Sequence, residues 1–227
     1  MEKSDIKLTT KIGAITTLIG SFCMVFGAML MGVSGADLDS ALDSGDISTY
    51  LIAANENRIL LIANLTLWIS GVILLGAAAT SMARLSTKRP AISTLIKYCY
   101  AVAIPLVVTA YSAWLAVVVR VSSQNNQTTI LIAETMGWFA SRADWISTIL
   151  VIAVGPALIS ASGRGVWVPN WLRIWSYFTL FTGLLNAIAM FTGGLTTFGF
   201  LIIPVGMGWM FAVSIVLFKR LNINDQK

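Results

Sequence analysis

Long apolar stretches alternate along the chain with short polar or charged segments. A stretch of about 20 apolar residues is typical of an α-helix that crosses the hydrocarbon core of a bilayer. Six such stretches occur, at about residues 12–33, 59–83, 98–119, 145–162, 174–192 and 198–218. The pattern predicts an all-α integral membrane protein, a six-transmembrane-helix bundle that forms a single polytopic membrane domain over residues 1–227.

The fourth stretch is the shortest, and an amphipathic segment at 128–141 precedes it. Two structures suit this segment: a helix that lies in the membrane interface, or an extension of the fourth span into the headgroups. The connection at 35–58 is the one sizeable excursion between spans. Within it, Ser48 followed by apolar residues predicts the capped start of a helix that leads into the second span.

Four acidic residues occupy the first half of that connection. Calcium-binding loops of the EF-hand type need ligands at fixed alternating positions with a glycine at the turn and a terminal glutamate. The segment with Asp37, Asp39, Asp43 and Asp46 lacks this spacing. We therefore expect these carboxylates to lie on a solvated helix face rather than in a metal site.

Composition agrees with a membrane location, and charge predicts the orientation. The chain is 57% hydrophobic and 11% charged, with a mean hydropathy of +0.82, whereas about 25% of residues are charged in soluble domains. Of the 15 Lys and Arg residues, all but Arg58, Arg120 and Arg142 lie on the side of the predicted bundle that carries both termini. Because basic residues near span ends stay in the cytoplasm, the N- and C-termini are predicted to be cytoplasmic, in a bacterial cytoplasmic (inner) membrane.

The residue types used for metals, cofactors and nucleic acids are scarce. The sequence has no histidine, and it has no Gly-rich phosphate loop. Cys23 and Cys99 fall at different depths of their spans, so neither a disulfide nor a closed zinc site is expected. The basic residues lie in short turns beside apolar helix ends, which favours anionic lipid headgroups over nucleic acid. We expect no cofactor, no metal and no nucleic-acid partner.

Polar side chains at membrane depth are the first candidates for a site, because they are costly there unless they face protein or water. Asn64, Tyr111 and Asn186 belong to the second, third and fifth spans. One interpretation is that they form hydrogen bonds between helices. The other is that they line a cavity that holds a ligand.

Ionisable residues gather at the outer rim of the third and fourth spans. Arg120 ends the third span, and Glu134, Arg142 and Asp144 lie before or at the start of the fourth. An ion pair of Arg120 with Glu134 or Asp144 would tie the two spans together. The alternative is a polar vestibule for the headgroup of a ligand. Nearby tryptophans can anchor the span at the interface or form an aromatic cage for a choline-type cation.

Proline and glycine indicate where helices bend and where they pack closely. Pro105, Pro156 and Pro204 interrupt the third, fourth and sixth spans, and kinked helices either surround a pocket or are simply part of the packing. Gly13, Gly20 and Gly27 recur every seven residues and so share one face of the first helix. That face favours close packing inside the bundle, or the seam of a homo-oligomer.

Two segments carry a resemblance to a known family. Residues 54–58, Ala-Asn-Glu-Asn-Arg, run into the second span, and residues 168–173, Val-Pro-Asn-Trp-Leu-Arg, lead into the fifth. The chain thereby resembles the bacterial DUF4386-type membrane proteins, an uncharacterised family. The resemblance implies a six-span topology and supplies no activity, cofactor or catalytic residue.

Two classes of function follow. The first is a non-enzymatic integral membrane protein that acts by binding, as a partner subunit of a membrane complex or as a binder of a lipid or other hydrophobic ligand. The alternative is a small transporter or channel lined by the kinked third, fourth and sixth helices, which requires Asn64, Tyr111 and Asn186 to face one water-filled cavity. No nucleophile and base are spaced to suggest each other, which disfavours an enzyme.

Overall fold

The computed structural model describes residues 2–86, 88–192 and 195–225, which form helices and no strand. The helices are α1 (Lys3–Ser34), α2 (Leu38–Ser44), α3 (Ile47–Glu56), α4 (Arg58–Arg84), α5 (Pro90–Ala116), α6 (Gln127–Ile149), α7 (Gly155–Gly163), α8 (Asn170–Thr192) and α9 (Leu195–Asp225). Two π-helical turns, η1 (Val117–Val121) and η2 (Leu150–Val154), continue α5 and join α6 to α7. The all-α prediction is confirmed.

Within the described residues, 5 helical segments are long and apolar enough to cross a membrane: Lys3–Ser34, Arg58–Arg84, Pro90–Val121, Gln127–Gly163 and Leu201–Asn222. They contain the first, second, third and fourth predicted spans, and Leu201–Asn222 overlaps the sixth. The predicted fifth span lies on α8, a helix of 23 residues that does not belong to these 5. Large apolar side chains such as Phe26, Phe181 and Ile188 point away from the bundle, as expected of a membrane protein.

The long helices form a ring in chain order. Each packs on its neighbours in the sequence, α1 on α4, α4 on α5, α5 on α6, α7 on α8 and α8 on α9. The first and last helices, α1 and α9, also pack together and complete the ring. This arrangement leaves an interior that faces several helices at once.

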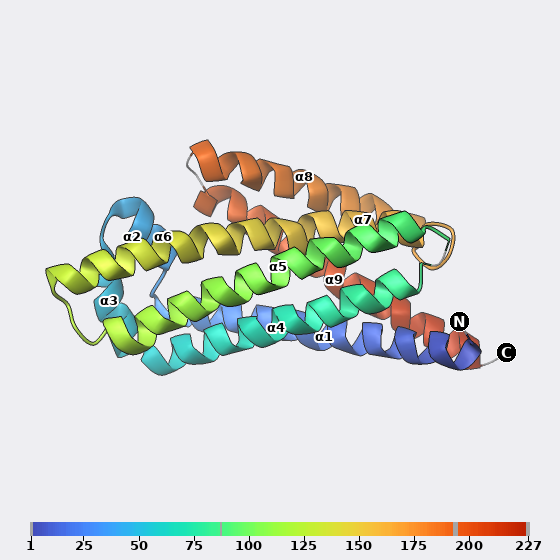
Figure 1. Cartoon of the computed structure of the whole chain (residues 1–227), viewed down its shortest axis with the longest axis horizontal. Coiled ribbons are helices and arrows are strands. Elements are labelled where there is room, and N and C mark those ends of the chain that lie inside the picture. Colours follow the sequence, from blue (N-terminus) through green and yellow to red (C-terminus); the bar gives the residue numbers. More distant parts are fainter. Residues whose placement is uncertain (1, 87, 193–194, 226–227) are drawn as a thin grey trace.

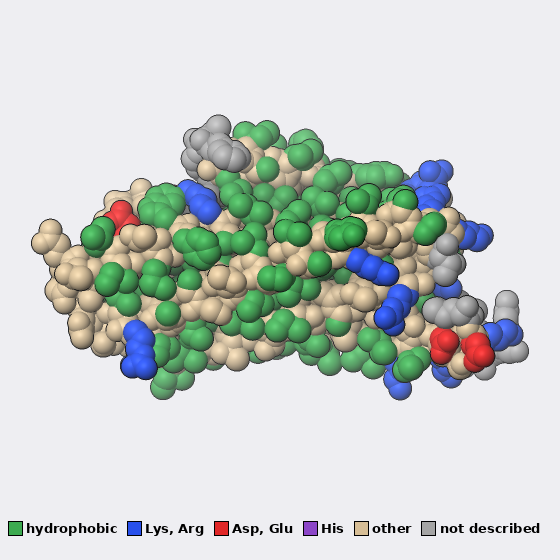
Figure 2. Space-filling model, in the orientation of Figure 1, with side chains coloured by type: hydrophobic (Ala, Val, Ile, Leu, Met, Phe, Trp, Pro, Cys, Tyr) green, Lys and Arg blue, Asp and Glu red, His purple; other side chains and the backbone are tan. Residues whose placement is uncertain are grey.

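The two ends of the ring differ. Figure 1 shows α2 and α3 at one end, here called the capped end, and both termini at the opposite end, here called the terminal end. On the face shown in Figure 2, Lys and Arg side chains gather toward the terminal end, while apolar side chains cover the middle. The described structure thus places both chain ends on one side of the bundle.

The amphipathic segment at 128–141 extends the fourth span. It belongs to α6, and the helix runs through η2 into α7 without a break in the chain of helical residues. The π-helical turn is held by side chains of neighbouring helices. Pro156 has no N–H to offer, and the hydroxyl of Tyr100 donates instead to the carbonyl of Val151 over 2.9 Å. Thr179 likewise donates to the carbonyl of Ala153 over 3.4 Å.

The capped end is built from two short helices with aspartate caps. Asp37 accepts hydrogen bonds from the first backbone N–H groups of α2, and Asp46 accepts one from the backbone N–H of Thr49 in α3. The prediction that Ser48 caps this helix was therefore wrong. Ser48 instead accepts a hydrogen bond from the Asn125 side chain over 2.9 Å, which links α3 to the connection before α6.

Candidate functional site

A cavity of about 470 Å³ lies inside the ring, beneath the capped end. This volume is within the range of about 300–1,000 Å³ that small-molecule sites occupy. Its walls come from five of the long helical segments and from α2. The lining residues are Met24, Val25, Ala28, Met29, Met31, Asp37, Asp39, Trp68, Val72, Leu75, Val107, Tyr111, Trp114, Asp144, Trp145, Ser147, Thr148, Val151, Ile152, Ile203, Pro204 and Met207.

The helical segments that contain the three prolines take part in these walls. Pro204 itself lines the cavity, and Ile152 lies in the π-helical turn η2 that precedes Pro156. Val107 follows Pro105 by half a turn on α5. Pro204 thus belongs to the lining, and Pro105 and Pro156 lie close in the sequence to lining residues.

Polarity changes along the depth of the cavity. At the capped end, the lining consists of Asp37, Asp39 and Asp144 together with aromatic side chains. Further toward the terminal end, the lining residues are mostly apolar. On α4 the lining passes from Trp68 to Leu75, and on α6 it passes from Asp144 to Val151 and Ile152 in η2. The cavity is amphipathic: the end beside α2, here called the mouth, is acidic, and the rest is mostly apolar.

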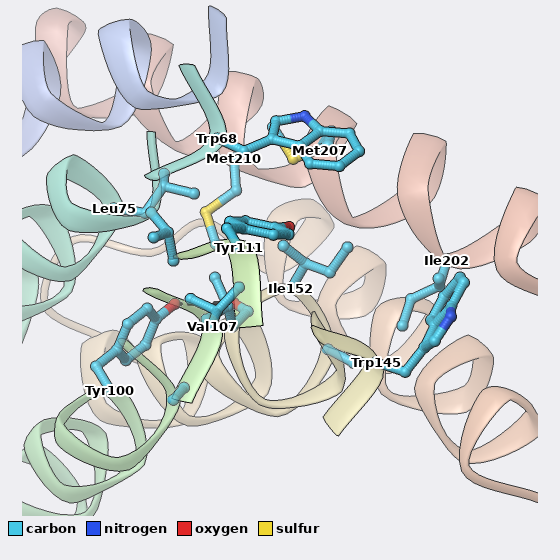
Figure 3. Packing of buried hydrophobic residues seen from close by; sticks show 14 of the residues in the cluster. Trp68, Leu75, Tyr100, Val107, Tyr111, Trp145, Ile152, Ile202, Met207 and Met210 are labelled. Carbon is cyan, nitrogen blue, oxygen red and sulfur yellow. Dashed lines mark hydrogen bonds between the residues drawn. The ribbon is translucent and has the colours of Figure 1, made fainter. Parts of the chain in front are cut away.

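The middle of the cavity is aromatic and sulfur-rich. Trp68 and Tyr111 lie side by side with ring centroids 5.1 Å apart, and Trp114 meets Trp68 edge to face at 6.1 Å. Figure 3 shows Trp68 and Tyr111 near Met207 and Ile152, which come from α9 and η2. Electron-rich surfaces of this kind attract cations as well as apolar groups.

Asp39, in the first turn of α2, faces α6 at the mouth of the cavity. Its carboxylate accepts a hydrogen bond from Trp145 Nε1 over 3.1 Å and lies beside the Ser141 hydroxyl. Partial burial raises the pKa of Asp39 above its ordinary value, against the opposing effect of these donors and of Arg142. The expectation that the acids of this segment lie on a solvated face was thus wrong for Asp39, whereas Asp43 is exposed.

Asp144 shares the mouth with Asp39. Its carboxyl group is in polar contact with the Tyr111 hydroxyl and accepts a hydrogen bond from Thr148 over 3.4 Å. The two carboxyl groups of Asp39 and Asp144 are close enough to repel each other. Two of the predicted site residues, Tyr111 and Asp144, are therefore brought together in the cavity.

The hydrogen-bond donors of the lining are already in use. Trp68 Nε1 donates to the Met24 carbonyl over 3.0 Å, and Trp114 Nε1 donates to the Tyr50 hydroxyl over 2.7 Å. Ser147 donates to the Ala143 carbonyl over 2.7 Å. With Trp145 and Thr148 also donating to aspartates, the lining offers a ligand carboxylate oxygens, aromatic rings and sulfur.

The other two polar candidates lie outside this lining. Asn64 is buried on α4, and its Nδ2 donates to the carbonyl of Gly27 on α1 over 2.8 Å. Asn64 therefore forms an interhelical hydrogen bond. Asn186 is buried on α8, and its side-chain amide has no hydrogen-bond partner among the described residues. Among the described lining residues, the cavity therefore has Tyr111 and neither asparagine.

The ionisable residues predicted at the outer rim do not all come together either. Arg120 is exposed at the end of η1, and among the described residues it pairs with neither Glu134 nor Asp144. Glu134 is half-buried on α6. The Arg142 guanidinium lies over the Trp138 ring, 4.5 Å from its centroid, and outside the cavity lining. The structure therefore places Asp144 in the cavity lining and leaves Arg120, Glu134 and Arg142 outside it.

The glycine face of α1 lies against α4. A Cβ on Gly20 would come within 3.0 Å of the Gly71 carbonyl, and one on Gly27 within 2.5 Å of the Trp68 ring. Close packing inside the bundle thus accounts for this face. Gly27 also fixes the position of Trp68, since the indole occupies the space where a side chain at position 27 would lie.

Sequence reasoning missed Asp39, Trp68 and Trp114 as lining residues. Trp68 and Trp114 sit one helical turn or less from Asn64 and Tyr111, which were identified, and polar-aromatic clustering at that depth was the available signal. Asp39 had no such signal because its inward position depends on how α2 folds back over α6.

Among the described residues, no group of three or more His, Cys, Asp or Glu side chains is arranged to hold a metal ion. The lining contains no cysteine or lysine nucleophile, and its hydroxyls donate to carbonyl or carboxylate oxygens.

No family model, no curated protein and no solved structure matches this chain.

Proposed function

We propose that this chain is a non-enzymatic integral membrane protein that binds a hydrophobic or amphiphilic ligand between its helices. The observation that carries the proposal is the cavity of about 470 Å³ inside the ring, with an apolar interior and a polar mouth. Sites for small molecules are typically concave, mostly apolar and equipped with a few polar groups that orient the ligand.

The proposal includes the topology expected from the sequence. It comprises six spans, with both termini in the cytoplasm of a bacterium and the capped end on the outer side of the cytoplasmic membrane. Support comes from the location of both termini at one end of the ring and from the basic side chains gathered near them (Figures 1 and 2). Membership of the DUF4386-type family is likewise part of this proposal.

The cavity favours ligand binding over the other functions considered. A partner subunit requires an outer surface, whereas the glycine face of α1 is already covered by α4. A transport path lined by Asn64, Tyr111 and Asn186 requires one shared cavity, and of these three Tyr111 lines it.

The proposal is tested by purifying the full chain in native-lipid particles and measuring retained small molecules by native mass spectrometry. Ala28 lines the cavity, so Ala28→Phe fills part of it and is expected to abolish retention. Ala77 is exposed on α4 outside the lining, so Ala77→Phe is the matched control and should retain the molecule. Equal retention by both variants, or a stoichiometric protein companion in place of a small molecule, would contradict the proposal.

A further inference from the structure

The mouth of the cavity is rich in carboxyl groups. Asp37, Asp39 and Asp144 all line it, and among the described lining residues there is no Lys or Arg. Two of these charges are partly balanced. Asp37 caps the N-terminus of α2, and Arg142 acts on Asp39 from outside the lining. Asp144 faces hydroxyl groups and has no cationic partner in the described structure.

The lining presents unoccupied hydrogen-bond acceptors, whereas few of its hydrogen-bond donors are free. The indole N–H groups of Trp68, Trp114 and Trp145 are all bonded to protein oxygens, so their rings remain as the surfaces that a ligand meets. An ionised carboxylate has room for about four hydrogen bonds, and the carboxylates of Asp39 and Asp144 use only part of this capacity. Such a lining repels anions and suits a group that carries positive charge.

The apolar part of the cavity places a second requirement on a ligand. Below the mouth, the walls are formed by apolar residues of α4, α5, η2 and α9, among them Leu75, Val107 and Met207 (Figure 3). A small hydrophilic cation would leave this space unfilled, whereas an apolar chain attached to the cation would fill it.

We propose that the cavity selects a monocationic amphiphile, an amine or quaternary ammonium group on an apolar chain. Its charge lies between Asp39 and Asp144 near the faces of Trp68 and Tyr111, and its chain extends toward Leu75 and Ile152. One positive charge matches Asp144, the lining carboxyl group that neither caps a helix nor lies near an arginine. The inference rests on the proposed function and adds the charge and shape of the ligand.

The test compares three probes of equal chain length on the full chain in phosphatidylcholine nanodiscs, with empty nanodiscs subtracted. The probes are decyltrimethylammonium, its uncharged isostere with carbon in place of nitrogen, and decyl sulfate. Binding is followed by titration calorimetry. We expect the cation to bind at least about tenfold more tightly than the isostere, and decyl sulfate to bind most weakly.

Two isosteric substitutions separate charge from fold. Asp144→Asn is expected to weaken decyltrimethylammonium binding about tenfold while leaving the isostere unchanged, which also shows that the variant is folded. Asp43→Asn removes the same charge from the exposed face of α2 and is expected to change neither.

The outcomes distinguish this inference from the proposed function. Equal affinity for the cation and the isostere, or an unchanged affinity in Asp144→Asn, overturns charge selection and leaves the hydrophobic-ligand function in place. A preference for decyl sulfate also overturns it. Failure of all three probes to bind, together with equal retention by Ala28→Phe and Ala77→Phe, refutes the proposed function itself.

Discussion

Trp114 donates its indole N–H to the Tyr50 hydroxyl over 2.7 Å, and both side chains are buried. The bond joins α5, a wall of the cavity, to α3 of the capped end. Trp145 makes a corresponding link from α6 to Asp39 of α2. Each short helix above the cavity is thus hydrogen-bonded to a different wall.

Tyr50→Phe removes the acceptor of Trp114 and is expected to destabilise the protein by about 1–3 kcal/mol, because a buried N–H is left without a partner. Trp114→Phe should cost a comparable amount, and the double variant should cost less than the sum of the two. Unfolding in graded denaturing detergent measures all three. Strictly additive losses would mean that the two side chains do not act as a pair.

Tyr100→Phe removes the donor to the Val151 carbonyl in the π-helical turn η2. We expect a loss of about 1–3 kcal/mol, since that carbonyl lies in the protein interior without a replacement donor. Tyr98 provides the matched control two residues earlier on α5, because it is 67% exposed whereas Tyr100 is 2% exposed. A stability change in Tyr98→Phe as large as that in Tyr100→Phe would argue against this role.

Gly27→Ala places a Cβ within 2.5 Å of the Trp68 ring, so the indole must move. Overpacking of this kind costs about 1–3 kcal/mol, and here it should also weaken ligand binding because Trp68 lines the cavity. A Cβ on Gly32, in the same helix, meets no atom within 4 Å. Gly32→Ala is expected to gain about 0.5–1 kcal/mol from helix propensity, with ligand binding unchanged. Detergent unfolding and probe titration on both variants measure these effects.

The affinity for decyltrimethylammonium is expected to depend on pH, although the probe itself does not titrate. Burial raises the pKa of Asp39, and a bound cation favours its ionised form. Lowering the pH through this raised pKa protonates Asp39 and weakens binding by at most about tenfold per pH unit. Asp37, Asp144 and Arg142 are the other charged groups that surround it.

Titration calorimetry between neutral and acidic pH measures this dependence. The uncharged isostere should bind equally across the range, and Asp39→Asn should reduce the pH dependence for the cation, with Asp144 as the remaining titrating group. A cation affinity that rises on acidification would contradict the assignment of Asp39.

The membrane-type helices were predictable because their signal is local. Twenty consecutive apolar residues predict a span without knowledge of its neighbours, and the predicted fourth span extends to Gln127 in α6. The register of the glycines at 13, 20 and 27 likewise identified the face of α1 that packs on α4.

The acidic mouth was only partly predictable because it depends on tertiary placement. Asp144 was identified from its position at the start of a span, and Tyr111 from its depth. Asp39 is one of four acids in a short connection, and its spacing does not distinguish it from exposed Asp43. What separates them is the packing of Leu38 and Leu42 against Gly137 of α6, a contact between distant parts of the chain.

The closure of the ring by α1 and α9 has a consequence for biosynthesis. The cavity takes one wall from the first long helix and another from the last, so it does not exist until the end of the chain has entered the bilayer. During synthesis, Asp144 and the aromatic groups around it lack Ile203, Pro204 and Met207, which later line the cavity with them. Insertion of the final helix is therefore the step that completes the cavity.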